Sequence, residues 1–382
     1  MDADAPRGLL AHFQSLEDPR GPRVWHYFHD LLVIAMLAII CGAESWTEVA
    51  LFGRSKRKWL ATFLALPHGI PSHDTFGRLF AALDPDQLER CFQSWTSALA
   101  QASGGRLIAT DGKTLRRSFD KAGNHAAIHM VSAWSASNRM VLGQLACDAK
   151  SNEITALPKL LAMLDLKGAI VTADAMHCQK KTAAQIVKQG GDYLMPVKDN
   201  QKTLHEDVKL FFAEAIVAGW AHTGHAYHET IEKDHGRIET RRCWCTWEVG
   251  WLQQHAHWPA LGSVMCVEAT RQLINPATGP GKTSVERRYY LSSLDGRDAR
   301  AMLGYARGHW SVENSLHWCL DVSFREDLCR LRKGHGAENF SRLRRWSLNL
   351  LKAERTTKAG IQAKRLKCGW NHDYLLQVLT HT

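Results

Sequence analysis

The sequence contains no apolar run long enough to cross a lipid bilayer. The most apolar stretch, residues 31–41, is far shorter than the roughly 20 residues that a membrane-spanning helix needs. It also starts too far along the chain for an export signal, because charged and polar residues occupy the segment before it. We therefore expect a buried helix here, in a soluble, cytoplasmic protein.

Internal repeats, low-complexity segments and a disulfide framework are also missing. The 10 cysteines are scattered through 382 residues, a pattern typical of reduced thiols in a cytosolic protein. Cys243 and Cys245 precede His255 and His257, but this spacing fits no common zinc module, so we expect ordinary residues there.

Acidic residues are scarce near the C-terminus. The whole chain has 48 Lys and Arg against 38 Asp and Glu, a net charge of +10. From Arg325 onward there are 13 basic against 5 acidic residues, so 13 − 5 = +8 of that charge lies in this segment. Such an excess favours a polyanionic partner, although charge alone does not separate nucleic acid from an acidic membrane surface.

The basic residues are densest at Arg330, Arg332, Lys333, Arg342, Arg344 and Arg345. Arg342 and Arg345 share one face of an expected helix, with Trp346 beside them. We predict a helix that faces DNA; the alternative is a charged face that supports only solubility.

The first hundred residues have helical patterning. We expect helices over residues 31–40, 46–66 and 75–83, with a capped turn at 69–74. The last two could form a helix-turn-helix that contacts DNA through Arg78, or an ordinary helical pair. A Gly- and Ser-containing segment at 102–105 suggests domains at 1–101 and 102–355, followed by a basic tail at 356–382.

After residue 105 the pattern changes to short apolar runs. We expect strands at 106–110, 126–135, 140–147, 169–173 and 192–198, with helices at 153–164 and 180–189. This β-β-β-α-β-α-β order predicts an α/β fold with a mixed sheet whose later strands are parallel. A β-rich insertion at about 220–296 and helices at 298–320 and 338–355 follow.

Two acidic residues stand directly after apolar strands. Asp111 follows the first strand, and Asp174 follows the strand at 169–173. Carboxylates at the ends of neighbouring strands repel each other unless a divalent cation lies between them, and oxygen ligands suit Mg²⁺ or Mn²⁺. The alternative is that each Asp is a turn residue or a helix cap.

A third acid, Glu313, lies in a helical segment rich in Trp and His. His309, Glu313 and His317 are spaced four residues apart, so they share one helix face. A solvated amphipathic helix explains the spacing but not this composition. A zinc hydrolase that uses these three residues is another alternative, although it leaves Asp111 and Asp174 without a role.

Several longer stretches together carry a family resemblance across nearly the whole chain. They are Cys41–Trp46, Gly69–Phe76, Asp111–Arg116, Lys150–Ile154, Thr172–Gln179, Gly190–Tyr193, His235–Glu239, His309–Trp318 and Leu320–Val322. In these stretches the chain resembles the DDE transposases of the insertion-sequence type, and most closely the H-repeat-associated proteins linked to Rhs elements.

The resemblance implies a ribonuclease H-like catalytic fold after a helical N-terminal domain. It assigns the catalytic, metal-binding triad to Asp111, Asp174 and Glu313, with two Mg²⁺ or Mn²⁺ ions. It also implies cleavage at transposon ends, transfer of the 3′ hydroxyl into target DNA, and a homodimer or larger assembly on DNA. The wider group carries Tyr, Arg and Lys at fixed positions around the Glu. This chain departs from that pattern, because it has Ala306, His309 and Leu320 at the corresponding positions. Asp321 and Glu326 are therefore fallback third acids.

Basic residues near the expected strand ends are candidates for gripping DNA phosphates. They are Lys113, Arg116, Arg117 and Lys198, and His309 joins them as a candidate DNA contact. Two alternatives keep the same fold: a catalytically silent DNA-binding protein from a decayed element, and a metal-dependent nuclease that cuts without joining.

Overall fold

The computed structural model describes residues 11–100, 106–119, 126–147, 153–234, 236–252, 257–275 and 279–380. By its internal contacts the chain divides into two compact units. Unit 1 consists of Met1–Gly104, Gly112–Ala156 and Val312–Thr382, and unit 2 of Gly105–Asp111 and Leu157–Ser311. The expected boundary at 102–105, residues 150–152 of one matched stretch, His235 and His255 lie outside the described residues. The domain limits drawn from the sequence stay a prediction.

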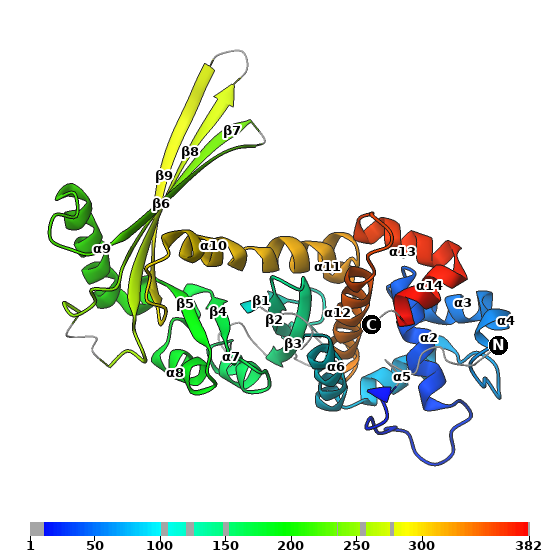
Figure 1. Ribbon diagram of the computed structural model, residues 1–382. Coiled ribbons are helices and arrows are strands. Elements are labelled where there is room, and N and C mark those ends of the chain that lie inside the picture. Colours follow the sequence, from blue (N-terminus) through cyan, green and yellow to red (C-terminus); the bar gives the residue numbers. More distant parts are fainter. Residues whose placement is uncertain are drawn as a thin grey trace. The chain divides into compact units, whose positions relative to one another are not determined.

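Unit 2 is built on a twisted mixed sheet (Figure 1). Its strands are β1 (Arg106–Thr114), β4 (Ala169–Ala173), β5 (Asp192–Val197), β6 (Ala226–Asp234), β7 (Arg237–Thr246), β8 (Ser263–Asn275) and β9 (Gly279–Ser292). Their order is β1-β4-β5-β9-β8-β7-β6, with β1, β4 and β5 parallel and the rest antiparallel. This confirms the parallel later strands and the β-rich insertion, but β1 continues to Thr114 instead of ending before Asp111.

Helices cover this sheet because its strands are apolar. β4 has the sequence AIVTA and is almost wholly buried, as is usual for a parallel strand covered on both faces. Helix α8 (Lys180–Lys188) packs on β5, α9 (Lys202–Val217) on β9, and α10 (Ala299–His309) on β4, β6 and β7. Met302 and Leu303 of α10 join Leu194 and Met265 in one core cluster.

The insertion strands carry arginines that are paired with glutamates across the sheet. Arg241 of β7 lies 2.7 Å from Glu232 of β6, and Arg242 of β7 lies 2.7 Å from Glu229 of β6. Arg287 likewise lies 2.7 Å from Glu268. Opposite charges on neighbouring strands stabilise the pairing modestly. They also neutralise one another, so these arginines do not form a bare cationic surface.

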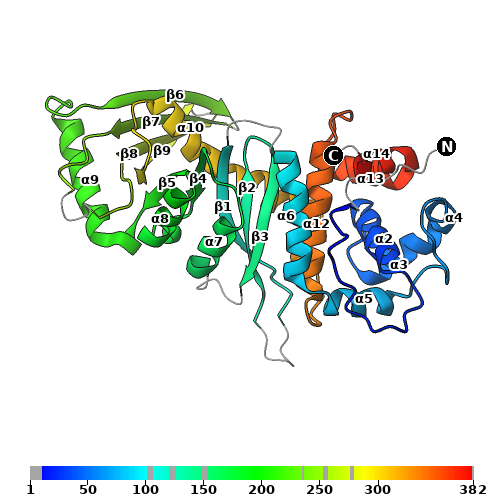
Figure 2. The same cartoon turned by 60° about the horizontal axis from the view of Figure 1, so that its bottom comes forward.

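Unit 1 contains helices from both ends of the chain around a β-hairpin. They are α2 (Phe28–Ile40), α3 (Trp46–Ser55), α4 (Arg57–Leu60), α5 (His73–Ala82), α6 (Pro85–Ala100), α11 (Trp318–Val322), α12 (Gly336–Ala353), α13 (Ile361–Trp370) and α14 (His372–Thr380). The hairpin is β2 (His129–Ser135) with β3 (Met140–Cys147). Helices α6 and α12 lie side by side against β3 (Figure 2).

Helix α2 is buried along nearly its whole length, which confirms the prediction for residues 31–40. Within the described residues, no helix is both long and apolar enough to span a bilayer. The single helix predicted at 46–66 is wrong: the helix is interrupted at Lys56, which has φ −105° and ψ 11°.

The expected DNA-facing helix is α12, and the prediction for its arginines is wrong. Arg342 and Arg345 are 0% exposed. Arg342 Nε lies 3.1 Å from Glu89 and its Nη1 2.6 Å from Glu338, while Arg345 Nη1 lies 2.9 Å from Glu326. Buried guanidinium groups need such partners. These arginines therefore hold α12 inside unit 1 and are not available to DNA.

Substitution Arg345→Met should destabilise the protein by about 3–5 kcal/mol, because Glu326 would remain as a buried carboxylate without its nearest cation. Urea denaturation measures this change. Arg355→Met is the matched control, since Arg355 is exposed just beyond α12 and should change stability by less than about 0.5 kcal/mol. Equal losses in the two variants would contradict this account of α12.

The segment predicted as a basic tail folds into α13 and α14. Lys364 and Arg365 of α13 are buried. The Glu354 carboxylate organises this region: it accepts hydrogen bonds from the Thr356 and Thr357 amides at 2.6 and 3.1 Å and from the Tyr374 hydroxyl at 2.7 Å. Burial raises the pKa of Glu354, but the bonds from Thr356, Tyr374 and Lys364 outweigh it and lower that pKa to about 2.

A lowered carboxyl pKa means that the ionised form stabilises the fold. The contribution of Glu354 should be present above about pH 4.5 and be lost as the pH falls toward about 2. Glu354→Gln should therefore reduce the urea midpoint at neutral pH and flatten its decline across this acid window. Asp373→Asn, at an exposed position of α14, should leave the pH dependence near that of the wild type. Parallel curves for Glu354→Gln and the wild type would refute this role.

Candidate functional site

The register of β1 and β4 brings two acidic residues to the same level. Thr110 pairs with Ala173 in the parallel register, so Asp111 and Asp174 come one residue further along each strand. Neighbouring strands lie about 4.8 Å apart, and residues at matched positions of parallel strands point to the same face. The register therefore brings Asp111 and Asp174 to the same level of two neighbouring strands, as the sequence predicted.

Asp174 does not act as a helix cap. It precedes a short 3₁₀ turn, Ala175–His177, but its side chain makes no capping hydrogen bond. The side chain is 61% exposed and lies 3.5 Å from Nε2 of His309. The interaction with His309 lowers the pKa of Asp174. Partial burial raises that pKa, but by less, so the net shift is downward. Asp174 is thus an accessible carboxylate that is kept ionised.

Helix α10 places His309 at this position. The His309 ring lies between Asp174 and Thr172, whose Oγ1 is 3.1 Å from Nδ1. The preceding residue, Gly308, lies against Leu107 of β1, where a Cβ atom would collide with the leucine side chain. A glycine is needed here because α10 passes so close to the strand. The close approach fixes His309 over the ends of β1 and β4.

A small cavity of about 90 Å³ opens beside Asp174. Two cations, Lys198 and Arg288, line it together with His309 and Trp310. The Arg288 guanidinium lies 5.0 Å from the centre of the Trp310 ring, and Trp310 is 43% exposed. Lys198 was among the predicted phosphate contacts. Arg288 was missed, because it lies on β9 and nothing in its local sequence connects it with Asp174.

Glu313 lies in unit 1, at the start of a π-helical turn, Glu313–His317. The helical segment predicted at 298–320 is confirmed, with a change in its winding: α10 ends at His309, residue 310 is a turn, and the π-helical turn leads directly into α11 at Trp318. Glu313 is exposed, and π-turns within helices are rare and frequent at functional sites. Its place in the triad stays a prediction.

No group of three His, Cys, Asp or Glu side chains able to hold a metal ion occurs among the described residues. The proposed zinc set gains no support, since both ring nitrogens of His309 are engaged by Thr172 and Asp174. Cys243 and Cys245 are buried in the core. The hydrogen bond between the two thiol groups, together with burial, raises the pKa of Cys243. They are structural thiols.

The other basic candidates divide into buried and exposed ones. Lys113 is buried, and its Nζ lies 2.6 Å from Asp321 and 2.9 Å from Asp327, so its prediction as a phosphate contact is wrong. Both fallback acids are also paired: Asp321 lies against Lys113, and Glu326 is buried against Arg345. Arg116, Arg330, Arg332 and Lys333 are exposed and Arg117 is half-buried, and their DNA contacts stay predictions.

Comparisons with known proteins show the family of the chain. The model of the transposase DDE domain family matches residues 102–350, and the model of its associated N-terminal region matches residues 10–96. The chain belongs to the DDE transposase family.

Relatives extend the match over the whole chain. The H repeat-associated protein YhhI of Escherichia coli (strain K12) is 38% identical over 373 residues, 97% of both chains. The protein YbfL of the same strain shows the same identity and coverage. A Xanthobacter autotrophicus protein encoded in the dhlA 3′ region is 44% identical over 288 residues, 74% of this chain and 92% of that protein. The resemblance of this DDE transposase to H-repeat-associated proteins is thereby confirmed.

Replacing His309 with Leu should raise the pKa of Asp174, because the imidazole is the main group that lowers it. The carboxyl resonance of Asp174 in ¹³C-labelled protein, assigned by its absence in Asp174→Asn, should then titrate at higher pH than in the wild type. Lys198→Met should shift it in the same direction by less, since Lys198 contributes least. An unchanged titration in His309→Leu would contradict the role given to the ring.

Proposed function

We propose that this DDE transposase cuts DNA at transposon ends and transfers the freed 3′ hydroxyl into target DNA. The observation that carries the proposal is the parallel register that sets Asp111 beside an accessible, ionised Asp174. The order β1-β2-β3-α7-β4-α8-β5, with α7 at Glu153–Ala162 and β1, β4 and β5 parallel, supports a ribonuclease H-like fold.

The donor set fits a hard divalent cation. Asp111 and Asp174 offer carboxylate oxygens, which Mg²⁺ and Mn²⁺ prefer, and Glu313 would complete the ligands. When bound, such ions activate the attacking hydroxyl, neutralise charge at phosphorus and assist the departing 3′ oxygen.

The chain's own residues hold and orient the DNA. Exposed Lys198 lines the cavity beside Asp174, where it would contact a phosphate next to the cleaved bond. Arg288 lines the same cavity, but its guanidinium is paired with Glu286 at 2.8 Å. His309 keeps the Asp174 side chain oriented and ionised, and acts as a positioning residue. Joining needs two transposon ends in one complex, so we propose at least a homodimer on DNA.

The test uses duplex DNA that carries the sequences flanking this coding region, with Mg²⁺ present or chelated. Asp111→Asn should reduce cleavage at least about a hundredfold, because loss of a metal ligand removes several kcal/mol of transition-state stabilisation. Glu313→Gln should have a comparable effect. Asp295→Asn is the matched control, since Asp295 is an exposed acid of unit 2 outside the site.

The products distinguish the alternatives. Joined strand-transfer product supports the transposase, whereas cleavage without joining indicates the nuclease. Binding without cleavage in the wild type indicates the silent DNA-binding protein. Cleavage by Asp111→Asn at the rate of Asp295→Asn would remove Asp111 from the mechanism.

A further inference from the structure

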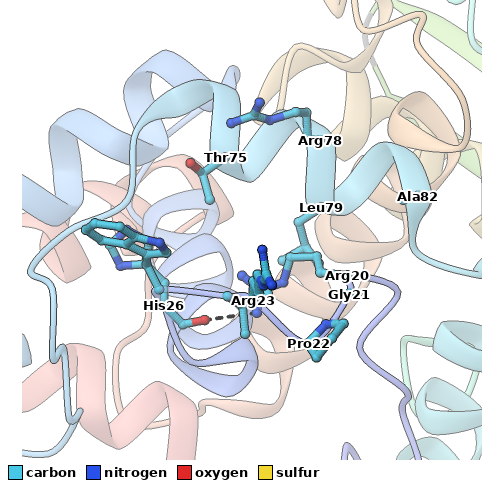
Figure 3. A pocket seen from close by; sticks show the side chains of 11 residues that line it. Arg20, Gly21, Pro22, Arg23, His26, Thr75, Arg78, Leu79 and Ala82 are labelled. Atoms are coloured by element: carbon cyan, nitrogen blue, oxygen red, sulfur yellow. Dashed lines mark hydrogen bonds between the residues drawn. The ribbon is translucent and has the colours of Figure 1, made fainter.

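A groove of about 760 Å³ lies in unit 1, between helix α5 and the chain segment that precedes α2. Thr75 and Arg78 of α5 form one wall, and Arg20, Arg23 and His26 form the other (Figure 3). Trp25 lines the same groove. None of these residues belongs to the site around Asp174, so the groove has no role in the chemistry described above.

Two of the three arginines that line the groove have no carboxylate partner among the described residues. Arg23 and Arg78 are both exposed, and neither forms an ion pair with a carboxylate of the described residues. No Asp or Glu lines the groove, counting the part of the chain that the structure describes. The arginines of the β6–β9 insertion differ in this respect, because glutamates on neighbouring strands face them.

One arginine of the groove has a structural role. Arg20 donates to Asp18 at 2.8 and 2.7 Å and to the carbonyl of His26 at 2.9 Å. These bonds tie the segment before α2 into a fixed turn, the last of them drawn as a dashed line in Figure 3. Arg20 thereby holds Arg23 opposite Arg78 instead of offering its own charge to a ligand.

Trp25 adds a flat apolar face at the rim. It is 72% exposed, and its ring contacts His68 with the centroids 5.2 Å apart. An aromatic ring beside unpaired arginines is a combination typical of nucleic-acid grooves, where cations hold phosphates and rings contact sugars or bases.

We propose that this groove binds the sugar–phosphate backbone of DNA, with phosphates at Arg23 and Arg78 and a sugar packed against Trp25. The proposal rests on the proposed function in taking DNA as the substrate. It also revises the role expected for α5: Arg78 contacts the backbone from a groove wall rather than reading bases from a recognition helix. The groove therefore contributes affinity that does not depend on sequence.

The test measures binding of a fluorescein-labelled duplex of arbitrary sequence by anisotropy, with EDTA present so that cleavage cannot interfere. Salt is varied from about 50 to 200 mM, because each phosphate contact contributes about −0.9 to the slope of log K against log salt. The double variant Arg23→Gln/Arg78→Gln should flatten the slope by about 1.8. Trp25→Ala should weaken binding and leave the slope unchanged, since it removes no charge.

The matched control is Arg54→Gln/Arg90→Gln, which removes two exposed arginines of unit 1 outside the groove. Circular dichroism checks that all variants are folded. The proposal would be overturned if the slope of log K against log salt were the same in the groove variant and in this control, even if the wild type binds and cuts DNA. A wild type that binds no DNA at any salt concentration would instead overturn the proposed function.

Discussion

The parallel pairing of β1 with β4 is the constraint on which the site depends. A shift of one residue in this register would turn Asp111 and Asp174 to opposite faces of the sheet. The register is fixed by short, buried apolar strands and by α10, which Gly308 allows to lie against Leu107. The same close approach brings His309 to Asp174. Strand packing, helix packing and the electrostatics of the acid are therefore linked.

Charge serves two different purposes in this molecule. Arg342 and Arg345 are buried, and their ion pairs with Glu89, Glu338 and Glu326 hold the C-terminal helices in unit 1. Other cations stay exposed: Lys198 beside Asp174, and Arg23 and Arg78 in the groove of α5. The basic excess counted from composition thus overstates the surface available to DNA. What decides the role of each arginine is whether a carboxylate lies within reach of it.

Several elements could be predicted from the sequence because the signals are local. The AIVTA run before Asp174, the Met140–Cys147 strand and the apolar α2 each carry their pattern within a few residues. Other features depend on tertiary packing, which local patterns do not contain. Burial of Arg345 depends on Glu326, the folded tail depends on Glu354, and Arg288 reaches Asp174 from a distant strand. The π-helical winding of Glu313–His317 likewise has no glycine or proline within it to announce it.

The central claim is that Asp111 and Asp174 share one divalent cation site. Replacing the cation with Fe²⁺ and generating hydroxyl radicals with ascorbate and peroxide cuts a polypeptide near the bound iron. The account predicts cuts close to both Asp111 and Asp174, which excess Mg²⁺ suppresses and which Asp174→Asn abolishes at both positions. Cuts near one of the two residues alone, or at neither, would contradict a shared site.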